Sequence, residues 1–216
     1  MLSQHLISRF AGVLGLALGM TVASMASPTG LITIPTADLA PAYEVSSSFA
    51  TNLTNSGAGL MQYNRVGILN FMEVGADYDD YAGDIVGAVK VSTQLKGLGG
   101  TFAAGVDGLG LNNRTWYMVY SSDIDDTAPV RFHTGILDPQ GTMAPFLGLE
   151  LPLLRNATFM LEGVAGDISS LTGGVKFNLM DLYEVKTGLV VSPKVTQAPV
   201  GARYHVFVEV GRTFGF

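Results

Sequence analysis

The side chains that could do acid–base chemistry are few, and His133 and His205 are the first to consider. His133 follows Arg131 by two positions, and His205 precedes Glu209 by four. A hydrolase of the serine–histidine–acid kind needs a serine hydroxyl within reach of the histidine. No serine lies beside either histidine in the sequence, and neither histidine has a visible partner. We therefore predict no catalytic residues and no enzymatic activity, and we interpret both histidines as members of charge pairs in an enclosed interior.

Four aspartates, Asp77, Asp79, Asp80 and Asp84, lie close together and could bind Ca²⁺, which prefers oxygen ligands. Their spacing lacks the fixed glycine and the terminal glutamate of an EF-hand loop. A solvated turn is the simpler interpretation. Gly97-Leu98-Gly99-Gly100 is also interpreted as a turn, because it does not open a helix as a nucleotide-binding loop would. We predict neither a metal site nor a cofactor site.

Composition narrows the class of protein. The chain has 216 residues, which suits one domain, with 48% hydrophobic and only 14% charged residues. Soluble domains carry roughly one quarter charged residues. The formal net charge of −6 argues against nucleic-acid binding, because no basic surface is available to displace counterions. The absence of cysteine excludes disulfides and thiolate metal sites.

Residues 1–26 have the pattern of a removable signal peptide. A polar start with Arg9 precedes the apolar run Phe10–Ala23, and Ser24-Met25-Ala26 places small residues at a cleavage site. A membrane anchor is the alternative, but the run is shorter than the ~20 residues that a spanning helix needs. We expect cleavage after Ala26 and a location outside the cytoplasm.

The rest of the chain alternates with period two in segments of about ten residues, separated by short turns rich in glycine, asparagine, aspartate and proline. These segments predict an all-β protein: a closed antiparallel up-and-down transmembrane barrel of about twelve strands, with ten strands as an alternative. The predicted strands are 43–53, 57–66, 71–79, 84–95, 100–107, 113–121, 130–137, 143–151, 157–165, 171–179, 182–192 and 202–216.

The two faces of these strands differ in chemistry. Around Tyr183–Val191, for example, Glu184 and Lys186 alternate with large apolar residues. A soluble sandwich shows similar alternation, but sparse charge, glycine-rich polar faces and strand lengths near 9–11 residues favour a membrane barrel. Segments 57–66 and 113–121 alternate ambiguously, and we assign no faces there. The residues predicted to line the lumen are Glu73, Asp77, Lys90, Arg131, His133, Glu150, Glu162, Lys176, Glu184, Lys186, Arg203, His205 and Glu209.

The final segment resembles the C-terminal strand that the barrel-insertion machinery of bacterial outer membranes recognises by strand pairing. Apolar residues occur at spacings of two, and the last position is aromatic. The predicted insertion signal consists of Tyr204, Val206, Val208, Val210, Phe214 and Phe216. We therefore expect a bacterial outer-membrane location, with membrane lipid and the insertion machinery as partners and no nucleic acid.

Residues 27–42 precede the barrel, which we assign to residues 43–216. We predict that this N-terminal periplasmic segment folds against or into the periplasmic mouth as a short cap, because a free tail would expose Leu31, Ile32 and Ile34. A mobile tether left by processing is the alternative.

Three motifs resemble the YjbH-like outer-membrane barrels, a family associated with exopolysaccharide production and secretion. They are Thr29–Ala37 (TGLITIPTA), Asn70–Ala76 (NFMEVGA) and Thr101–Asp107 (TFAAGVD). The resemblance implies a short single-barrel form of that family, with polysaccharide export components as partners.

These observations leave three functions open. The first is a non-enzymatic outer-membrane barrel linked to exopolysaccharide export or envelope biogenesis. The second is a small passive pore or structural barrel without a polymer role. The third and least favoured is a lipid-modifying enzyme, since the sequence shows no catalytic set.

Overall fold

The structure is a computed structural model that describes residues 29–54, 57–79, 83–110, 114–124, 130–139, 141–180, 182–193 and 203–215. The predicted signal peptide and Phe216 lie outside the described residues, as does Asp80. Among the described residues, no helix is long and apolar enough to cross a bilayer.

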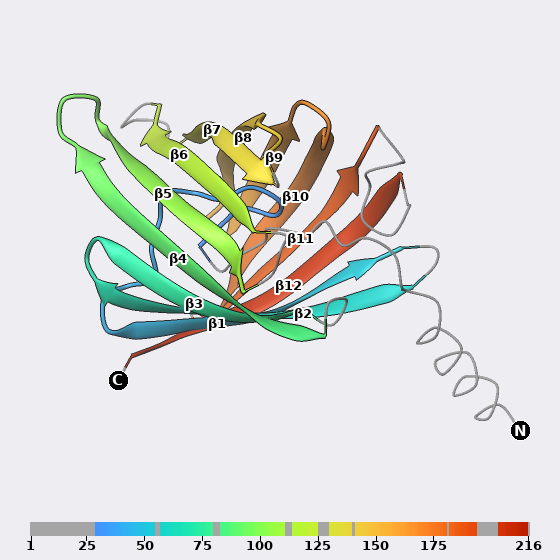
Figure 1. The fold of residues 1–216 in the computed structure, drawn as a ribbon, viewed down its shortest axis with the longest axis horizontal. Helices are drawn as coiled ribbons and strands as arrows, with labels where there is room; N and C mark the ends of the chain where they lie inside the picture. Colours follow the sequence, from blue (N-terminus) through green and yellow to red (C-terminus); the bar gives the residue numbers. More distant parts are fainter. Residues whose placement is uncertain are drawn as a thin grey trace, which may run out of the picture.

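Twelve antiparallel strands close into one barrel (Figure 1). Each strand pairs with its neighbours in chain order, and β1 pairs with β12 to close the ring. Their bounds differ from the predicted ones by at most three residues, so the prediction of a twelve-strand antiparallel barrel is confirmed. The strands are β1 (Glu44–Leu53), β2 (Ala58–Leu69), β3 (Met72–Asp79), β4 (Asp84–Leu95), β5 (Gly100–Leu109), β6 (Thr115–Asp123), β7 (Arg131–Pro139), β8 (Ala144–Leu154), β9 (Ala157–Val164), β10 (Ser170–Leu179), β11 (Tyr183–Val191) and β12 (Tyr204–Gly215).

The β1–β12 seam removes the sheet edges that a membrane could not tolerate. Its register runs without a shift from Glu44 opposite Gly215 to Leu53 opposite Val206. Backbone amides and carbonyls in lipid find no water to bond, so a spanning sheet must close on itself. We call the end where Glu44 and Gly215 pair the terminal end of the barrel.

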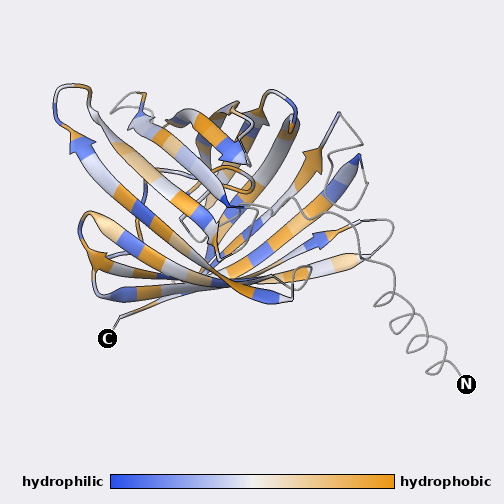
Figure 2. Cartoon of the chain, viewed as in Figure 1, coloured by the Kyte–Doolittle hydropathy of each residue, from blue (hydrophilic) through white to orange (hydrophobic). Residues whose placement is uncertain are grey.

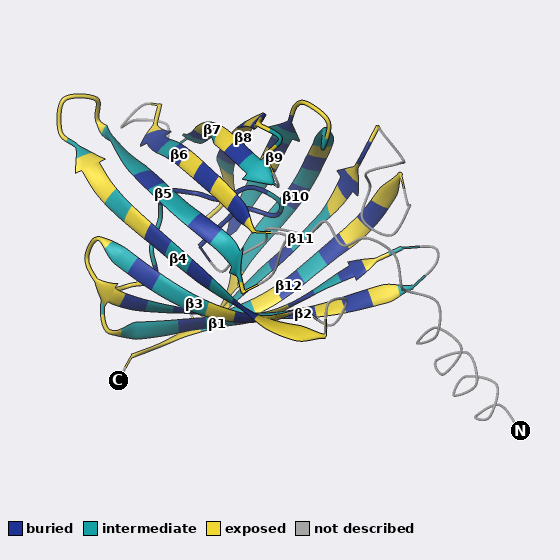
Figure 3. Ribbon diagram, viewed as in Figure 1, coloured by how far each residue is buried: buried dark blue, intermediate teal, exposed yellow. Residues whose placement is uncertain are grey.

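The outer surface is apolar. Exposed and buried residues alternate along most strands (Figure 3), and hydrophobic positions recur along the same strands (Figure 2). Many exposed positions carry large apolar side chains, such as Leu147, Leu171 and Leu189. In water such a surface would drive aggregation, whereas lipid covers it at no cost.

The interior is occupied by residues 29–40, which we call the strap. In Figure 1 the strap is the blue trace that runs inside the ring of strands. Gly30 and Pro35 form an antiparallel bridge, and the Leu31 amide donates to the Ile34 carbonyl at 3.0 Å, so the tip of the strap is a tight hairpin. Leu31, Ile32 and Ile34 are 0–1% exposed.

One connected apolar cluster joins this hairpin to the barrel wall. Its members from the strands include Tyr63, Tyr117, Leu137, Phe146, Met160 and Phe207. The core of the molecule is thus the lumen itself, and the strap supplies its centre.

A short link turns the chain from the strap into β1. The Tyr43 amide donates to the Gly67 carbonyl at 2.7 Å, the Glu44 amide donates to the Pro41 carbonyl at 3.0 Å, and Tyr43 adopts a left-handed φ of 63°. At Gly67 a Cβ atom would lie 2.1 Å from the Pro41 oxygen, so the link can approach β2 only because this residue is glycine.

Because the outer face contacts lipid, the cost of a charge there should depend on depth. We predict that Leu147→Arg, in the middle of β8, lowers the free energy of unfolding in phospholipid vesicles by about 2–4 kcal/mol. The matched variant Leu153→Arg, at the end of β8, should cost about 0–1 kcal/mol. Urea titration followed by heat-modified gel mobility measures both values, and equal costs would contradict a lipid-facing surface.

Candidate functional site

Glu162 of β9 holds the tip of the strap. Its carboxylate accepts the amide of Ile32 at 2.7 Å, the amide of Thr33 at 2.7 Å and the hydroxyl of Thr33 at 2.6 Å. Glu162 is 1% exposed, so these strap groups replace the water molecules that would hydrogen-bond to an exposed carboxylate. Charge-assisted bonds of this kind are about twice as strong as neutral ones. The tip of the hairpin is therefore fixed by a buried anion.

Lys186 of β11 contacts the same hairpin with the opposite charge. Its ammonium donates to the Gly30 carbonyl at 2.8 Å and lies 3.3 Å from Glu184 and 3.6 Å from Glu209. The tip is thus held by a carboxylate that binds amides and an ammonium that binds a carbonyl.

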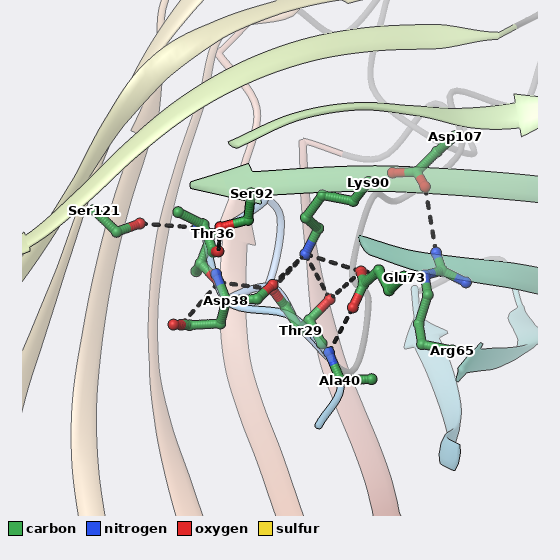
Figure 4. A network of polar contacts seen from close by, with 12 residues as sticks. Thr29, Thr36, Asp38, Ala40, Arg65, Glu73, Lys90, Ser92, Asp107 and Ser121 are labelled. Carbon is green, nitrogen blue, oxygen red and sulfur yellow. Dashed lines mark hydrogen bonds and ion pairs between the residues drawn. The ribbon is translucent and has the colours of Figure 1, made fainter. Parts of the chain in front are cut away.

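The base of the strap is held by β3 and β4 (Figure 4), which lie opposite β9 and β11 in the ring of strands. Glu73 accepts the Thr29 hydroxyl at 2.8 Å and the Ala40 amide at 2.6 Å. The Lys90 ammonium lies 3.0 Å from Glu73 and donates to the Asp38 carbonyl at 2.6 Å and to the Thr29 hydroxyl at 2.7 Å. Glu73 and Lys90 are 1% and 2% exposed. The two members of this ion pair therefore also hydrogen-bond to the backbone of the strap.

Contacts from β4, β6 and β7 hold the second half of the strap. The Arg131 guanidinium donates to both oxygens of Asp38, at 2.7 and 3.1 Å. The Ser92 hydroxyl donates to the Ala37 carbonyl at 3.0 Å, and the Ala37 amide donates to the Ser121 hydroxyl at 2.9 Å. The strap therefore contacts polar groups of β3, β4, β6, β7, β9 and β11, which span the lumen from wall to wall.

A serine, a histidine and a glutamate do meet in the lumen, contrary to what the sequence suggested. Ser121 Oγ lies 2.7 Å from His133 Nδ1, and His133 Nε2 lies 3.1 Å from Glu150, which accepts from Lys176 at 2.8 Å. In serine hydrolases the serine contacts Nε2 and the acid contacts Nδ1, so the nitrogens are reversed here. Ser121 is 1% exposed and its oxygen already accepts the strap amide. This chain of contacts supports the strap and offers no accessible nucleophile.

A second ion-pair group surrounds Arg65. Its guanidinium contacts Asp77, lies 3.3 Å from Asp107 and reaches Glu73 at 4.0 Å. The predicted cluster of aspartates is therefore divided, because Asp77 points inward to an arginine. Among the described residues no group of three histidine, aspartate or glutamate side chains is arranged to hold a metal ion.

Sequence reasoning did not identify Arg65, Asp107 or Ser121. Arg65 and Ser121 lie in segments 57–66 and 113–121, where the alternation of polar and apolar residues is ambiguous. Large apolar residues point inward there, among them Tyr63 and Tyr117, and they belong to the same buried apolar cluster as the tip of the strap.

The remaining predicted residues lie at varied depths. His205 and Glu209 are buried, and Glu184 is half-buried. Arg203 is exposed and precedes β12. His205 Nδ1 has no hydrogen-bond partner, and no contact joins it to Glu209 in the part of the chain described. The predicted insertion-signal residues Tyr204, Val206, Val210 and Phe214 are exposed, and Val208 is half-buried.

Glycines make room for the tip of the strap. A Cβ atom on Gly174 or Gly188 would lie 2.3 or 2.5 Å from Ile32 Cδ1, and one on Gly148 would lie 2.5 Å from Ile34 Cδ1. Any larger residue at these positions would meet the hairpin.

Comparison with known proteins identifies the fold. No family model matches the chain, and no curated protein does. Among solved structures, the NanC porin is 10% identical over 80% of this chain and 100% of its own, with a TM-score of 0.55. The KdgM porin in complex with disordered oligogalacturonate is 10% identical over 79% of this chain and 99% of its own, with a TM-score of 0.52.

This chain is an outer-membrane β-barrel with a porin-like fold. The closed ring, the apolar outer face and the likeness to porins agree on a location in the bacterial outer membrane, with lipid around the barrel.

Steric displacement of the strap is testable because the chain has no cysteine. We predict that Gly188→Leu pushes Ile32 out of its seat, and that a reporter Ala37→Cys then reacts with a water-soluble maleimide. In the parent chain Ala37 is 1% exposed, so the reporter should be protected.

Gly173→Leu is the matched control, because a Cβ atom on Gly173 meets nothing within 4 Å. It should leave the reporter protected. Equal labelling of the two variants would show that the strap is not held by this fit.

Proposed function

We propose that this protein is a small, non-enzymatic porin-like barrel of the outer membrane that its own N-terminal strap keeps closed, and that it admits small solutes when the strap leaves the lumen. The observation that carries the proposal is the strap itself, which crosses the lumen from Glu73 and Lys90 to Glu162 and Lys186. A solute cannot pass while these contacts persist.

The way the lumen is filled favours a removable occupant over a solid barrel. Small barrels are filled by wall side chains, whereas wider ones enclose a cavity or channel. Here the wall carries glycine opposite the hairpin, and the space is filled by a segment joined to the barrel at only one described end, through Pro41. Wall groups bind the strap largely through its backbone, and hydrated solutes can bond the same groups once it departs.

The proposal includes the maturation predicted from the sequence. Removal of residues 1–26 would give the strap a free end, and pairing of the final strand with the insertion machinery would place the terminal end in the periplasm. The strap would then enter the lumen from the periplasmic side.

Single-channel recording tests closure directly. We predict that the mature chain gives little or no conductance in planar bilayers, and that a chain lacking residues 27–40 gives stable open channels. Thr33→Cys/Thr172→Cys is the matched lock, because the two hydroxyl oxygens lie 3.4 Å apart and the chain has no other cysteine.

Oxidation of this lock should abolish any openings of the full chain, and reductant should restore them. A fully open parent chain would contradict the proposal. If the chain that lacks residues 27–40 folds but gives no conductance, a structural barrel without a pore would be the better-supported function.

The charge of the opened wall predicts its ion preference. Among the described wall residues of these ion pairs and strap contacts there are seven carboxylates, five arginines and lysines, and one histidine. The carboxylates are Glu73, Asp77, Asp107, Glu150, Glu162, Glu184 and Glu209, and the bases are Arg65, Lys90, Arg131, Lys176, Lys186 and His133. We expect the strap-deleted channel to prefer K⁺ over Cl⁻, because lumen charge concentrates the opposite ion. The reversal potential in a KCl gradient measures this preference, and anion selectivity would contradict it.

A link to exopolysaccharide export is the second candidate and rests on the resemblance of the Thr29–Ala37 motif to YjbH-like barrels. Its support is that this motif forms nearly the whole strap, so the resemblance coincides with the element that closes the lumen. Surface polymer measured after gene deletion tests it. A normal amount of surface polymer would contradict this link, and the pore would remain as the proposed function.

A further inference from the structure

The wall of the barrel contacts the strap mainly at its backbone. Wall side chains accept hydrogen bonds from the amides of Ile32, Thr33, Ala37 and Ala40, and they donate to the carbonyls of Thr29, Gly30, Ala37 and Asp38. Every amino acid except proline offers the same amide and the same carbonyl. These contacts therefore fit a polypeptide backbone of many sequences.

The charged members of this set are matched to the two kinds of backbone group. Glu162 takes two successive amides, those of Ile32 and Thr33, at 2.7 Å each, and Lys186 donates to the Gly30 carbonyl at 2.8 Å. An ionised carboxylate only accepts hydrogen bonds and an ammonium only donates them. The wall at the tip of the strap thus presents an acceptor for adjacent amides and a donor for a nearby carbonyl.

The side chain of Ile32 occupies a recess in the wall that we call the first seat. Gly174 and Gly188 form it, and a Cβ atom on either glycine would lie 2.3 or 2.5 Å from Ile32 Cδ1. Ile32 is 0% exposed. The recess therefore has the size of the end of a branched aliphatic side chain.

A second seat lies over Gly148. A Cβ atom there would lie 2.8 Å from Leu31 Cδ1 and 2.5 Å from Ile34 Cδ1. Both of these strap side chains are also fully buried, and the apolar cluster of the lumen surrounds them. Branched hydrocarbon groups fill such recesses, whereas the hydroxyls of a sugar would lose their water there without gaining apolar contact.

We propose that the lumen binds short peptides whose central residues are uncharged and branched aliphatic, and that the strap is a tethered copy of this ligand. The inference rests on the proposed function, because a free peptide can enter only after the strap has left. It names the class of solute that the opened barrel takes. Backbone hydrogen bonds supply affinity and the two seats supply selectivity, a division of roles found in other peptide-binding sites.

Capture of a free peptide in place of the strap tests the inference on the full mature chain. Thr172→Cys introduces a single thiol into the wall, and the Thr172 hydroxyl lies 3.4 Å from the Thr33 hydroxyl. A synthetic peptide of residues 29–40 that carries Thr33→Cys should form a disulfide with this thiol under copper–phenanthroline oxidation. Mass spectrometry measures the product.

Variant peptides separate seating from random collision. A peptide of unrelated sequence that keeps branched aliphatic residues at the three seated positions should be captured at a similar rate. Ile32→Ala in the peptide should slow capture by about tenfold, because the first seat stays empty. Leu39→Ala is the matched control, since Leu39 is half-buried and lies outside the apolar cluster, and it should have no effect. Excess maltose should not compete.

Wall variants with normal heat-modified gel mobility provide the second arm. Labelling of the introduced thiol by a water-soluble maleimide measures departure of the strap without any peptide. Adding Gly188→Leu should increase this labelling but lower the ratio of peptide capture to labelling, because leucine fills the first seat for strap and peptide alike. Gly173→Leu, where a Cβ atom meets nothing within 4 Å, should change neither value.

The two readouts distinguish failure of this inference from failure of the closed-pore proposal. Maleimide labelling without selective peptide capture would overturn the inference and leave the closed pore standing. Equal capture of the parent and Ile32→Ala peptides, or competition by maltose, would also overturn it. If neither maleimide nor peptide reaches the thiol, the strap does not leave and both proposals are wrong.

Discussion

The structure depends on the requirement that ionised groups withdrawn from water find partners. The barrel wall places carboxylates and ammonium groups beside the strap, where Glu162, Lys186 and Lys90 are 1–2% exposed, and each needs compensating charges or dipoles. Glu162 finds its compensation in strap amides, and Lys186 and Lys90 find part of theirs in strap carbonyls. The strap backbone, in turn, would carry unpaired amides in an apolar core without these residues. These buried polar groups of the wall and of the strap therefore depend on each other for partners.

The architecture could be predicted from the sequence because it follows from local alternation. A strand that separates lipid from an interior must alternate with period two, and this pattern does not depend on which strands are neighbours. The pattern is ambiguous in segments 57–66 and 113–121, which correspond to β2 and β6. Their inward residues Tyr63, Tyr117 and Val119 are apolar because they pack in the cluster that contains the strap. The ambiguity was therefore a signal of a lumen that is not filled with water.

The contacts of the site could not be predicted, because they depend on register and on a fit between distant segments. Ser121 meets His133 because β6 and β7 pair these two residues directly, and a shift of one residue would separate them. The depth of the strap depends on the space left by Gly174 and Gly188, which lie more than a hundred residues from Ile32 in the chain. Apolar residues at 31, 32 and 34 indicated that the segment is covered, but not by which strands.

The brevity of the link at Pro41–Tyr43 has a consequence for any molecule that enters the barrel. A binding partner attached by so short a connection competes as if it were present at millimolar levels or above, since it cannot diffuse away. A solute that binds the same carboxylate and ammonium groups must therefore be present at a higher concentration than this effective concentration of the strap, or must bind more tightly than the strap does. Binding of such a solute is therefore a competition between the tethered strap and the free solute for the same wall groups. The length of the connection affects this competition as much as the chemistry of the wall does.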